Sequence, residues 1–209
     1  MNQGGPTRTY HSALREQQAE QTRQLIADAA RDAFLERGWS GTSVRAVAQA
    51  AGVSQATVYN VYGSKAGLAM SLVDSIDGGA GGVARIVAEL SAGEGDPPAQ
   101  LRALIGFDRR LFEHGGAVIR VMMEGRRDHP ELAAAYDGGR NRGESNRRRI
   151  FETWPASAWR EGVTLDSAAD TYAMFCSVST FDIAVIERGW TPDQLEQWWF
   201  DTLSELLLA

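Results

Sequence analysis

Two short apolar stripes with one glycine between them constrain this chain more than any other feature. The stripes fall within residues 44–51 and 58–62, and each follows a serine, Ser43 or Ser54, of the kind preferred at a helix N-cap. Gly52 lies between them and permits a tight turn. The alanines of the first stripe allow two backbones to approach closely. The pattern therefore predicts two short helices crossing at a steep angle, a helix-turn-helix.

The rest of the chain also has helical periodicity, and no segment alternates with the period of a strand. We therefore expect an all-α protein, with an N-terminal three-helix helix-turn-helix domain followed by a larger helical domain. A first helix ending at Gly38 would bury the face formed by Ile26, Ala29, Ala30, Ala33 and Phe34. A fourth helix, capped by Ser64, would carry Leu68 and Leu72. Later helices are expected over 99–113, 117–127, 130–154, about 165–187, and from a capping box at Thr191 and Gln194 to the C-terminus.

Three parts of the chain follow from these patterns. Residues 1–12 are expected to be a disordered tail, 13–66 the helix-turn-helix domain, and 67–209 a larger helical domain. Glycines crowd the segment Gly78–Gly82, and each costs about 1 kcal/mol in a helix interior. We expect a hinge there, between the helix-turn-helix domain, which we call the head, and the larger helical domain, which we call the body.

Charge is unevenly distributed between the two predicted domains. The chain has a net charge of −6, yet residues 1–66 carry seven basic and five acidic side chains, against fourteen and twenty-two in the remainder. A small basic head on an acidic body is compatible with local binding to DNA. Lys65 is the only lysine of the chain.

Several classes of protein are disfavoured. No apolar run approaches the ~20 residues of a bilayer span, and the first twelve residues contain no signal-peptide core. The single cysteine, Cys176, excludes a disulfide framework and a four-cysteine zinc site. Gly79-Ala80-Gly81 followed by Ala84 loosely matches a dinucleotide fingerprint, but no strand pattern precedes it. Because motifs of hydrolases, zinc peptidases and P-loop proteins are also missing, we expect a cytoplasmic non-enzyme with no cofactor, metal or membrane partner.

The helix-turn-helix has an outward face suited to nucleic acid. Burial of Val47, Val53 and Val58 would turn the opposite side of the second helix toward solvent. That side carries hydrogen-bonding and small side chains, the kinds that contact base edges and phosphates: Gln55, Ala56, Thr57, Tyr59 and Asn60. Tyr62 falls on the inward phase, four residues after Val58, and is expected in the core.

This stretch resembles the tetracycline repressor family of transcriptional regulators. The resemblance covers residues 22–70 and rests on the helix Thr22–Arg37 followed by Gly38-Trp39, Thr42-Ser43, Val47-Ala48, Ala51-Gly52-Val53-Ser54, Thr57-Val58-Tyr59, and Ser64-Lys65 before Leu68. The lactose repressor family shares part of the turn motif. There, however, the motif begins the chain without a preceding helix, and a large sugar-binding domain follows it.

The resemblance implies roles for individual residues. Gln55, Ala56, Thr57 and Tyr59 occupy recognition-helix positions that face the major groove. Val44 and Arg45 begin the preceding helix, where the family approaches the DNA backbone or a base, and Lys65 matches a phosphate-contacting lysine. The sequence departs from the pattern at Val61, where the family usually has Tyr or His, and at Ala66, which replaces a common Glu.

The resemblance also implies a ligand-responsive regulator, a repressor, that binds a palindromic double-stranded operator as a homodimer. Residues 67–209 would then be its effector-binding and dimerisation domain. The half-sites would lie about 34 Å apart, and a small-molecule effector would release the DNA by changing the separation of the two heads. Candidate residues of the effector pocket are Phe107, Leu111, Met122, Met123, Phe151, Tyr172 and Cys176. Each of these is also a plausible core residue by its helical phase.

Dimerisation is expected through the last two helices, which are apolar on more than one face. The candidate interface residues are Phe181, Val185, Leu195, Trp198, Trp199, Thr202, Leu203 and Leu206. The alternative is that Trp198 and Trp199 complete the core of a single chain.

Other functions remain open at this stage. The run Arg140, Arg142, Arg147, Arg148 and Arg149 resembles a basic patch, but glutamates four residues away, Glu144 and Glu152, favour a solvated helix face with ion pairs. A DNA-binding protein that responds to no ligand, and an enzyme on an all-α scaffold, are the two rival classes.

Overall fold

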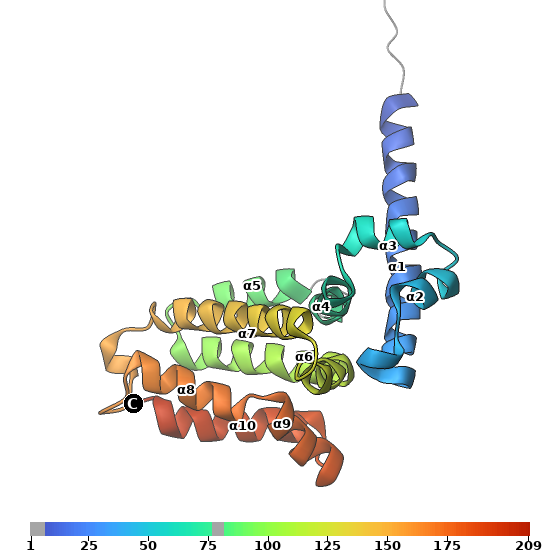
Figure 1. Ribbon diagram of the computed structural model, residues 1–209. Coiled ribbons are helices and arrows are strands. Elements are labelled where there is room, and N and C mark those ends of the chain that lie inside the picture. The colour runs from blue at the N-terminus through green and yellow to red at the C-terminus, as the bar shows by residue number, and fades with distance from the viewer. Residues whose placement is uncertain (1–6, 77–81) are drawn as a thin grey trace, which may run out of the picture. The chain divides into compact units, whose positions relative to one another are not determined.

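The computed structural model describes the backbone of residues 7–76 and 82–209, and the side chains of 15–74 and 83–209. Within these ranges the fold is all-α, as the periodicity predicts. The elements are α1 (Thr7–Gly41), α2 (Val44–Ala50), α3 (Gln55–Tyr62), α4 (Lys65–Ile76), α5 (Gly82–Ala92), α6 (Pro97–Gly125), α7 (Pro130–Phe151), a short 3-10 turn (Ala156–Ala158), α8 (Leu165–Phe175), α9 (Val178–Phe181), a π-helical segment (Asp182–Glu187) and α10 (Pro192–Leu207) (Figure 1).

The chain divides into two compact units, Met1–Ser71 and Leu72–Ala209. The sequence placed this boundary after residue 66, five residues earlier. Helix α1 begins at Thr7, inside the stretch for which a disordered tail was expected. The hinge expected at Gly78–Gly82 falls almost entirely on residues 77–81, which lie outside the described residues.

Helix α1 buries one face and bends near its C-terminal end. Ile26, Ala30 and Phe34 are fully buried, as their spacing predicts. Gly38 has φ +66°, a left-handed conformation that favours glycine. The hydroxyl of Thr42 donates back to the carbonyl groups of α1, with 2.8 Å to the nearer oxygen, so the chain is held in place where α2 starts.

Helices α2 and α3 form the expected helix-turn-helix. The Ser43 hydroxyl oxygen accepts a hydrogen bond from the Ala46 N–H at 3.1 Å, and that of Ser54 accepts from the Thr57 N–H at 3.0 Å. Gly52 makes the turn with φ +68°. Both serines therefore act as the N-caps that the sequence indicates.

A serine cap also marks the start of α4. The Ser64 hydroxyl accepts from the Gly67 N–H at 2.9 Å. A Cβ atom at Gly67 would lie 2.2 Å from the carbonyl oxygen of Tyr62. Only glycine therefore allows the end of α3 to approach the first turn of α4 this closely.

Helix α6 is the central element of the second unit. It packs against α5 and α7 on one side and against α9 and α10 on the other, as Figure 1 shows. One hydrophobic cluster, which we call the main hydrophobic cluster, contains buried residues of α6, α7, α8, α9 and α10 together with Trp154, Cys176 and Ala184. The core of this unit thus joins segments that are distant in the sequence.

Two expectations for helix limits in this unit are wrong. The first concerns Gly115 and Gly116, which were expected to separate two helices but lie inside the continuous α6. Both are buried, and a Cβ at Gly116 would be in ordinary van der Waals contact, at 3.7 Å, with the Val178 side chain of α9. The helix therefore continues through both glycines within the packed second unit, in spite of their low helix propensity.

The second concerns residues 165–187, where a single helix was expected. Cys176 has ψ +74°, which ends α8, and the Ser177 hydroxyl caps α9 by accepting from the Thr180 N–H at 3.2 Å. Residues 182–187 are π-helical. A side-chain cap offered by Ser177 competes with continuation of the helix.

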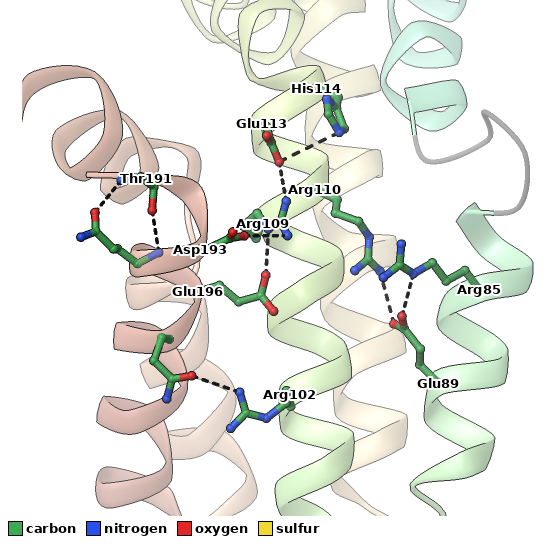
Figure 2. Close-up of polar contacts among 12 residues, drawn as sticks. Arg85, Glu89, Arg102, Arg109, Arg110, Glu113, His114, Thr191, Asp193 and Glu196 are labelled. Atoms are coloured by element: carbon green, nitrogen blue, oxygen red, sulfur yellow. Dashed lines mark hydrogen bonds and ion pairs between the residues drawn. The ribbon is translucent and has the colours of Figure 1, made fainter. Parts of the chain in front are cut away.

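Ion pairs join α6 to its neighbours on both sides (Figure 2). The Arg109 guanidinium lies 2.5 Å from Glu113 of its own helix and 2.8 Å and 3.2 Å from Glu196 and Asp193 of α10. On the other side, Glu89 of α5 pairs with Arg85 at 2.7 Å and with Arg110 of α6 at 3.3 Å.

None of the helices in the described ranges combines the length and apolarity needed to cross a membrane.

Candidate functional site

The exposed face of α3 carries most of the residues expected to contact DNA. Gln55, Ala56, Tyr59 and Asn60 are all exposed, and 48% of the Tyr59 surface is accessible. Thr57 is half-buried, and its hydroxyl lies 2.8 Å from that of Ser54. Helix α3 thus presents the amide groups of Gln55 and Asn60 and the phenol hydroxyl of Tyr59 to solvent, together with the small side chain of Ala56.

The start of α2 contributes one charged side chain to this unit's surface. Arg45 is exposed. Val44, also expected to contact DNA, is only 6% exposed because its side chain packs in the core of the head. The structure therefore corrects the expectation for the Val44 side chain. As the first residue of α2, Val44 has a backbone N–H without an acceptor in its own helix.

Lys65 has a structural partner that the sequence did not indicate. Its ammonium group donates a hydrogen bond to the carbonyl oxygen of Trp39 and lies 4.1 Å from the centroid of that residue's ring. Trp39 in turn stacks on Phe34 at 5.5 Å. Through these contacts the lysine connects the first turn of α4 to the end of α1.

Tyr62 lies only partly in the core. It is half-buried, and its hydroxyl donates to the carbonyl oxygen of Arg23 at 3.1 Å. Burial raises the pKa of the phenol above its ordinary value. This tyrosine therefore ties α3 to α1, which orients the exposed face of α3.

In the second unit, the expected pocket residues do not form one group. Phe151, Tyr172 and Cys176 belong to the main hydrophobic cluster. Met122 is buried outside that cluster, and Phe107, Leu111 and Met123 are half-buried. An open hollow of about 310 Å³ on α7 is lined by other, polar residues: Asn141, Arg142, Ser145, Asn146 and Arg149.

The carboxyl group of Asp108 is buried beside the main hydrophobic cluster, and the sequence pattern did not indicate it. The Tyr172 hydroxyl donates to Oδ2 of Asp108 at 3.0 Å. Nη1 of Arg147 lies 3.5 Å from the same oxygen, and its guanidinium lies 4.7 Å from the Tyr172 ring centroid. Burial raises the pKa of the Asp108 carboxyl, although Arg147 and the hydrogen bond from Tyr172 act in the opposite direction. Burial likewise raises the pKa of the Cys176 thiol well above its ordinary value, so this cysteine is not a reactive thiolate.

Arg147 therefore corrects the expectation of a fully solvated arginine face. Its side chain is only 17% exposed, whereas Arg148 makes the expected pair with Glu144, which is half-buried, and a further pair with the exposed Asp166 at 2.6 Å. A signal was present in the sequence, since Asp108 falls four residues after the apolar Leu104 and four before Phe112 on α6.

The expected dimer residues divide between core and surface. Phe181, Leu195, Trp199 and Leu203 are buried within the single chain, so their side chains are not available to a partner. Val185 and Thr202 are half-buried, while Trp198 and Leu206 are exposed.

The exposed pair is part of a larger set of exposed apolar side chains in the C-terminal segment. We call this set the C-terminal apolar face, and its members are Met174, Ile183, Ile186, Trp190, Trp198 and Leu206. Trp198 contacts both the Trp190 ring, at 5.9 Å between centroids, and the half-buried Phe175, at 5.8 Å. The π-helical segment shifts the helical phase, which is why simple spacing did not identify Ile183 and Ile186.

The helix-turn-helix is a motif of DNA-binding proteins. Residues 26–72 match the family described as bacterial regulatory proteins, tetR family. Over this part of the chain, the sequence is similar to the tetR family of transcriptional regulators.

Curated proteins also match part of this chain. The chain is 43% identical over 68 residues to the HTH-type transcriptional regulator AlkX of Mycobacterium tuberculosis, covering 31% of this chain and 32% of the relative. It is 35% identical over 89 residues to TtgR of Pseudomonas putida, covering 43% and 41%. The matched region thus spans about a third to two fifths of the length of these relatives.

The fold likeness extends over both units. The solved structure of NalD, the secondary repressor of the MexAB-OprM multidrug efflux pump in Pseudomonas aeruginosa, matches with a TM-score of 0.69 at 22% identity. The match covers 91% of this chain and 98% of NalD. At that identity the likeness concerns the fold.

Proposed function

We propose that this protein is a ligand-responsive transcriptional repressor. It binds a palindromic operator as a homodimer and is released by a small molecule bound in the second unit. The observation that carries the proposal is the exposed face of α3 in a capped helix-turn-helix. A cytoplasmic location belongs to the same proposal, because the operator lies on the chromosome.

The residues proposed to contact DNA are Arg45, Gln55, Ala56, Thr57, Tyr59 and Asn60, with Lys65 and the backbone of Val44 at the edge of the site. Tyr59 is the most informative of these. It is a large exposed side chain at the centre of the α3 face, so its removal changes binding without disturbing the core.

The proposed dimer uses the C-terminal apolar face. Exposed apolar patches of this kind mark interaction sites in folded proteins, and a two-fold dimer buries the same patch on both chains. Two heads on one dimer would match the two half-sites of a palindrome.

DNA binding is tested by fluorescence anisotropy with the DNA adjacent to the protein's own gene and an unrelated duplex of equal length. We expect tight, salt-sensitive binding to the first duplex only, and Tyr59→Ala to weaken it by roughly tenfold or more. Leu35→Ala is the matched control, since Leu35 is an equally exposed apolar residue on α1.

Equal, weak binding to both duplexes, followed by failure to select any sequence from random DNA, would contradict the proposal. Sequence-specific binding that no compound in a broad ligand screen weakens would instead favour a DNA-binding protein without an effector.

A further inference from the structure

The open hollow on α7 is lined by polar side chains that come from one side of the helix. None of its five lining residues is acidic or apolar, and all five are exposed: Asn141, Arg142, Ser145, Asn146 and Arg149. Their spacing of one, three, one and three residues keeps them on the same side of α7. Two guanidinium groups, two carboxamides and one hydroxyl therefore share a hollow of about 310 Å³.

The arginines of α7 differ in how well their charge is compensated. Arg147 and Arg148, which do not line the hollow, lie 3.5 Å and 2.6 Å from carboxylate oxygens. Arg142, which does line it, is 3.7 Å from the carboxylate of Asp74, and the two side chains are 62% and 63% exposed. An ion pair that is long and exposed holds its members weakly, so the Arg142 guanidinium is available to another anion.

Arg149 is compensated even less. Its Nη2 donates a hydrogen bond to Oδ1 of Asn146, which is a neutral acceptor. Among the described side chains, no carboxylate pairs with Arg149. The chain as a whole has a net charge of −6, so two arginines that lack a close carboxylate in one hollow form a local positive site on an acidic protein.

The chemistry of the lining selects a class of ligand. A guanidinium presents a planar fork of N–H donors that matches the oxygens of a phosphate group, whereas carboxamides and a hydroxyl both donate and accept hydrogen bonds. Pockets for apolar ligands are lined mostly by apolar side chains, and this hollow has none in its lining. Its volume lies near the lower limit of about 300 Å³ for ligand sites, which leaves room for a small body beside a phosphate group.

We propose that this hollow binds a phosphate monoester with a small hydroxylated body, the chemistry of a sugar phosphate. Arg142 and Arg149 bind the phosphate oxygens, and Asn141 and Ser145 form hydrogen bonds with the hydroxyl groups. Binding replaces the neutral contact of Arg149 with Asn146 by a charged one. The inference goes beyond the proposed function and does not depend on DNA binding.

The test is calorimetric titration of the full-length protein, at constant ionic strength, with glucose 6-phosphate, inorganic phosphate and glucose. We expect glucose 6-phosphate to bind with a Kd of about 1 mM or tighter, inorganic phosphate to bind more weakly, and glucose not to bind. Arg142→Met and Arg149→Met should each weaken binding of both phosphate compounds by about tenfold. Arg140→Met is the matched control, because Arg140 is an exposed arginine of the same helix that does not line the hollow.

A further variant separates the two halves of the ligand. Asn141→Ala removes a carboxamide assigned to the hydroxylated body, so it should weaken binding of glucose 6-phosphate and leave inorganic phosphate unchanged. All of these substitutions are at exposed positions, so the variants are expected to fold, and thermal unfolding checks this.

Four outcomes would overturn the inference. Two are the absence of binding by either phosphate compound and binding that Arg140→Met reduces as much as Arg149→Met does. The third is glucose 6-phosphate binding no tighter than inorganic phosphate. The fourth is displacement of glucose 6-phosphate by an unrelated DNA duplex through Arg149, which would assign the hollow to nucleic acid. Since the titration with phosphate compounds involves no DNA, its result is independent of the repressor proposal.

Discussion

Lys65 illustrates how one residue in the head can serve two purposes. Its ammonium group is held by the carbonyl and ring of Trp39, while the family resemblance implies a phosphate contact. An ammonium has three donors, so the two roles are compatible. They differ in a measurable way, because only the first contributes to stability when no DNA is present.

We therefore expect Lys65→Met to lower the free energy of unfolding by about 1 kcal/mol in the absence of DNA. Arg45→Met is the comparison, since Arg45 is exposed. It should leave stability unchanged and reduce the salt dependence of DNA binding by about one phosphate contact. Chemical denaturation followed by tryptophan fluorescence measures the first effect. Unchanged stability in Lys65→Met would mean that the Trp39 contact contributes nothing.

At the scale of elements, side-chain caps decide where most helices in this chain begin. Ser43, Ser54, Asp96, Thr164 and Thr191 each accept a hydrogen bond from a backbone N–H of the first turn. These caps could be recognised in sequence because they depend on residues three apart. Ser177 uses the same device, and its position inside an otherwise helical pattern explains why α8 ends at Phe175.

The cap of α10 gives a prediction for stability. Thr191 and Gln194 form a reciprocal capping box, with distances of 3.1 Å and 2.8 Å. Thr191→Ala should lower the free energy of unfolding by about 1 kcal/mol, because α10 carries core residues such as Trp199 and must be formed in the native state.

Thr202→Ala, a change of the same type in the middle of α10, is the control. Thr202 makes no cap, so it should have a smaller effect in urea denaturation. An equal loss of unfolding free energy in the two variants would show that the capping box stabilises the protein no more than a threonine in the middle of the helix.

The whole molecule presents an apolar face that a single chain leaves exposed. Ile186 is 61% exposed and Trp198 is 38% exposed, and both lie on the C-terminal apolar face. Burial of such side chains provides about 25 cal/mol per Å² of apolar surface removed from water. In the proposed dimer this apolar surface would be removed from water.

Ile186→Asp should therefore prevent the proposed dimer from forming, because it places a charge in the proposed interface. Sedimentation velocity measures the change. Leu25→Asp is the control, since Leu25 is a comparably exposed residue on α1 and should leave the dimer intact. A dimeric Ile186→Asp variant would place the interface elsewhere.

Local features of this protein were readable from sequence because they depend on neighbours a few residues apart. The α-helical class, the capped helix-turn-helix, the turn at Gly52 and the capping box of α10 are of this kind. The outward phase of Tyr59 on α3 followed from the same spacing.

Tertiary structure alone decided which of the apolar and charged residues of the second unit are buried, because burial there depends on helices distant in the sequence. It placed Trp199 in the core and Trp198 at the surface, and it kept α6 continuous through the buried Gly115 and Gly116. It also brought Asp108, Arg147 and Tyr172 from three helices to one point. No periodicity within one helix can indicate such a meeting, since the contact exists only after the helices have packed.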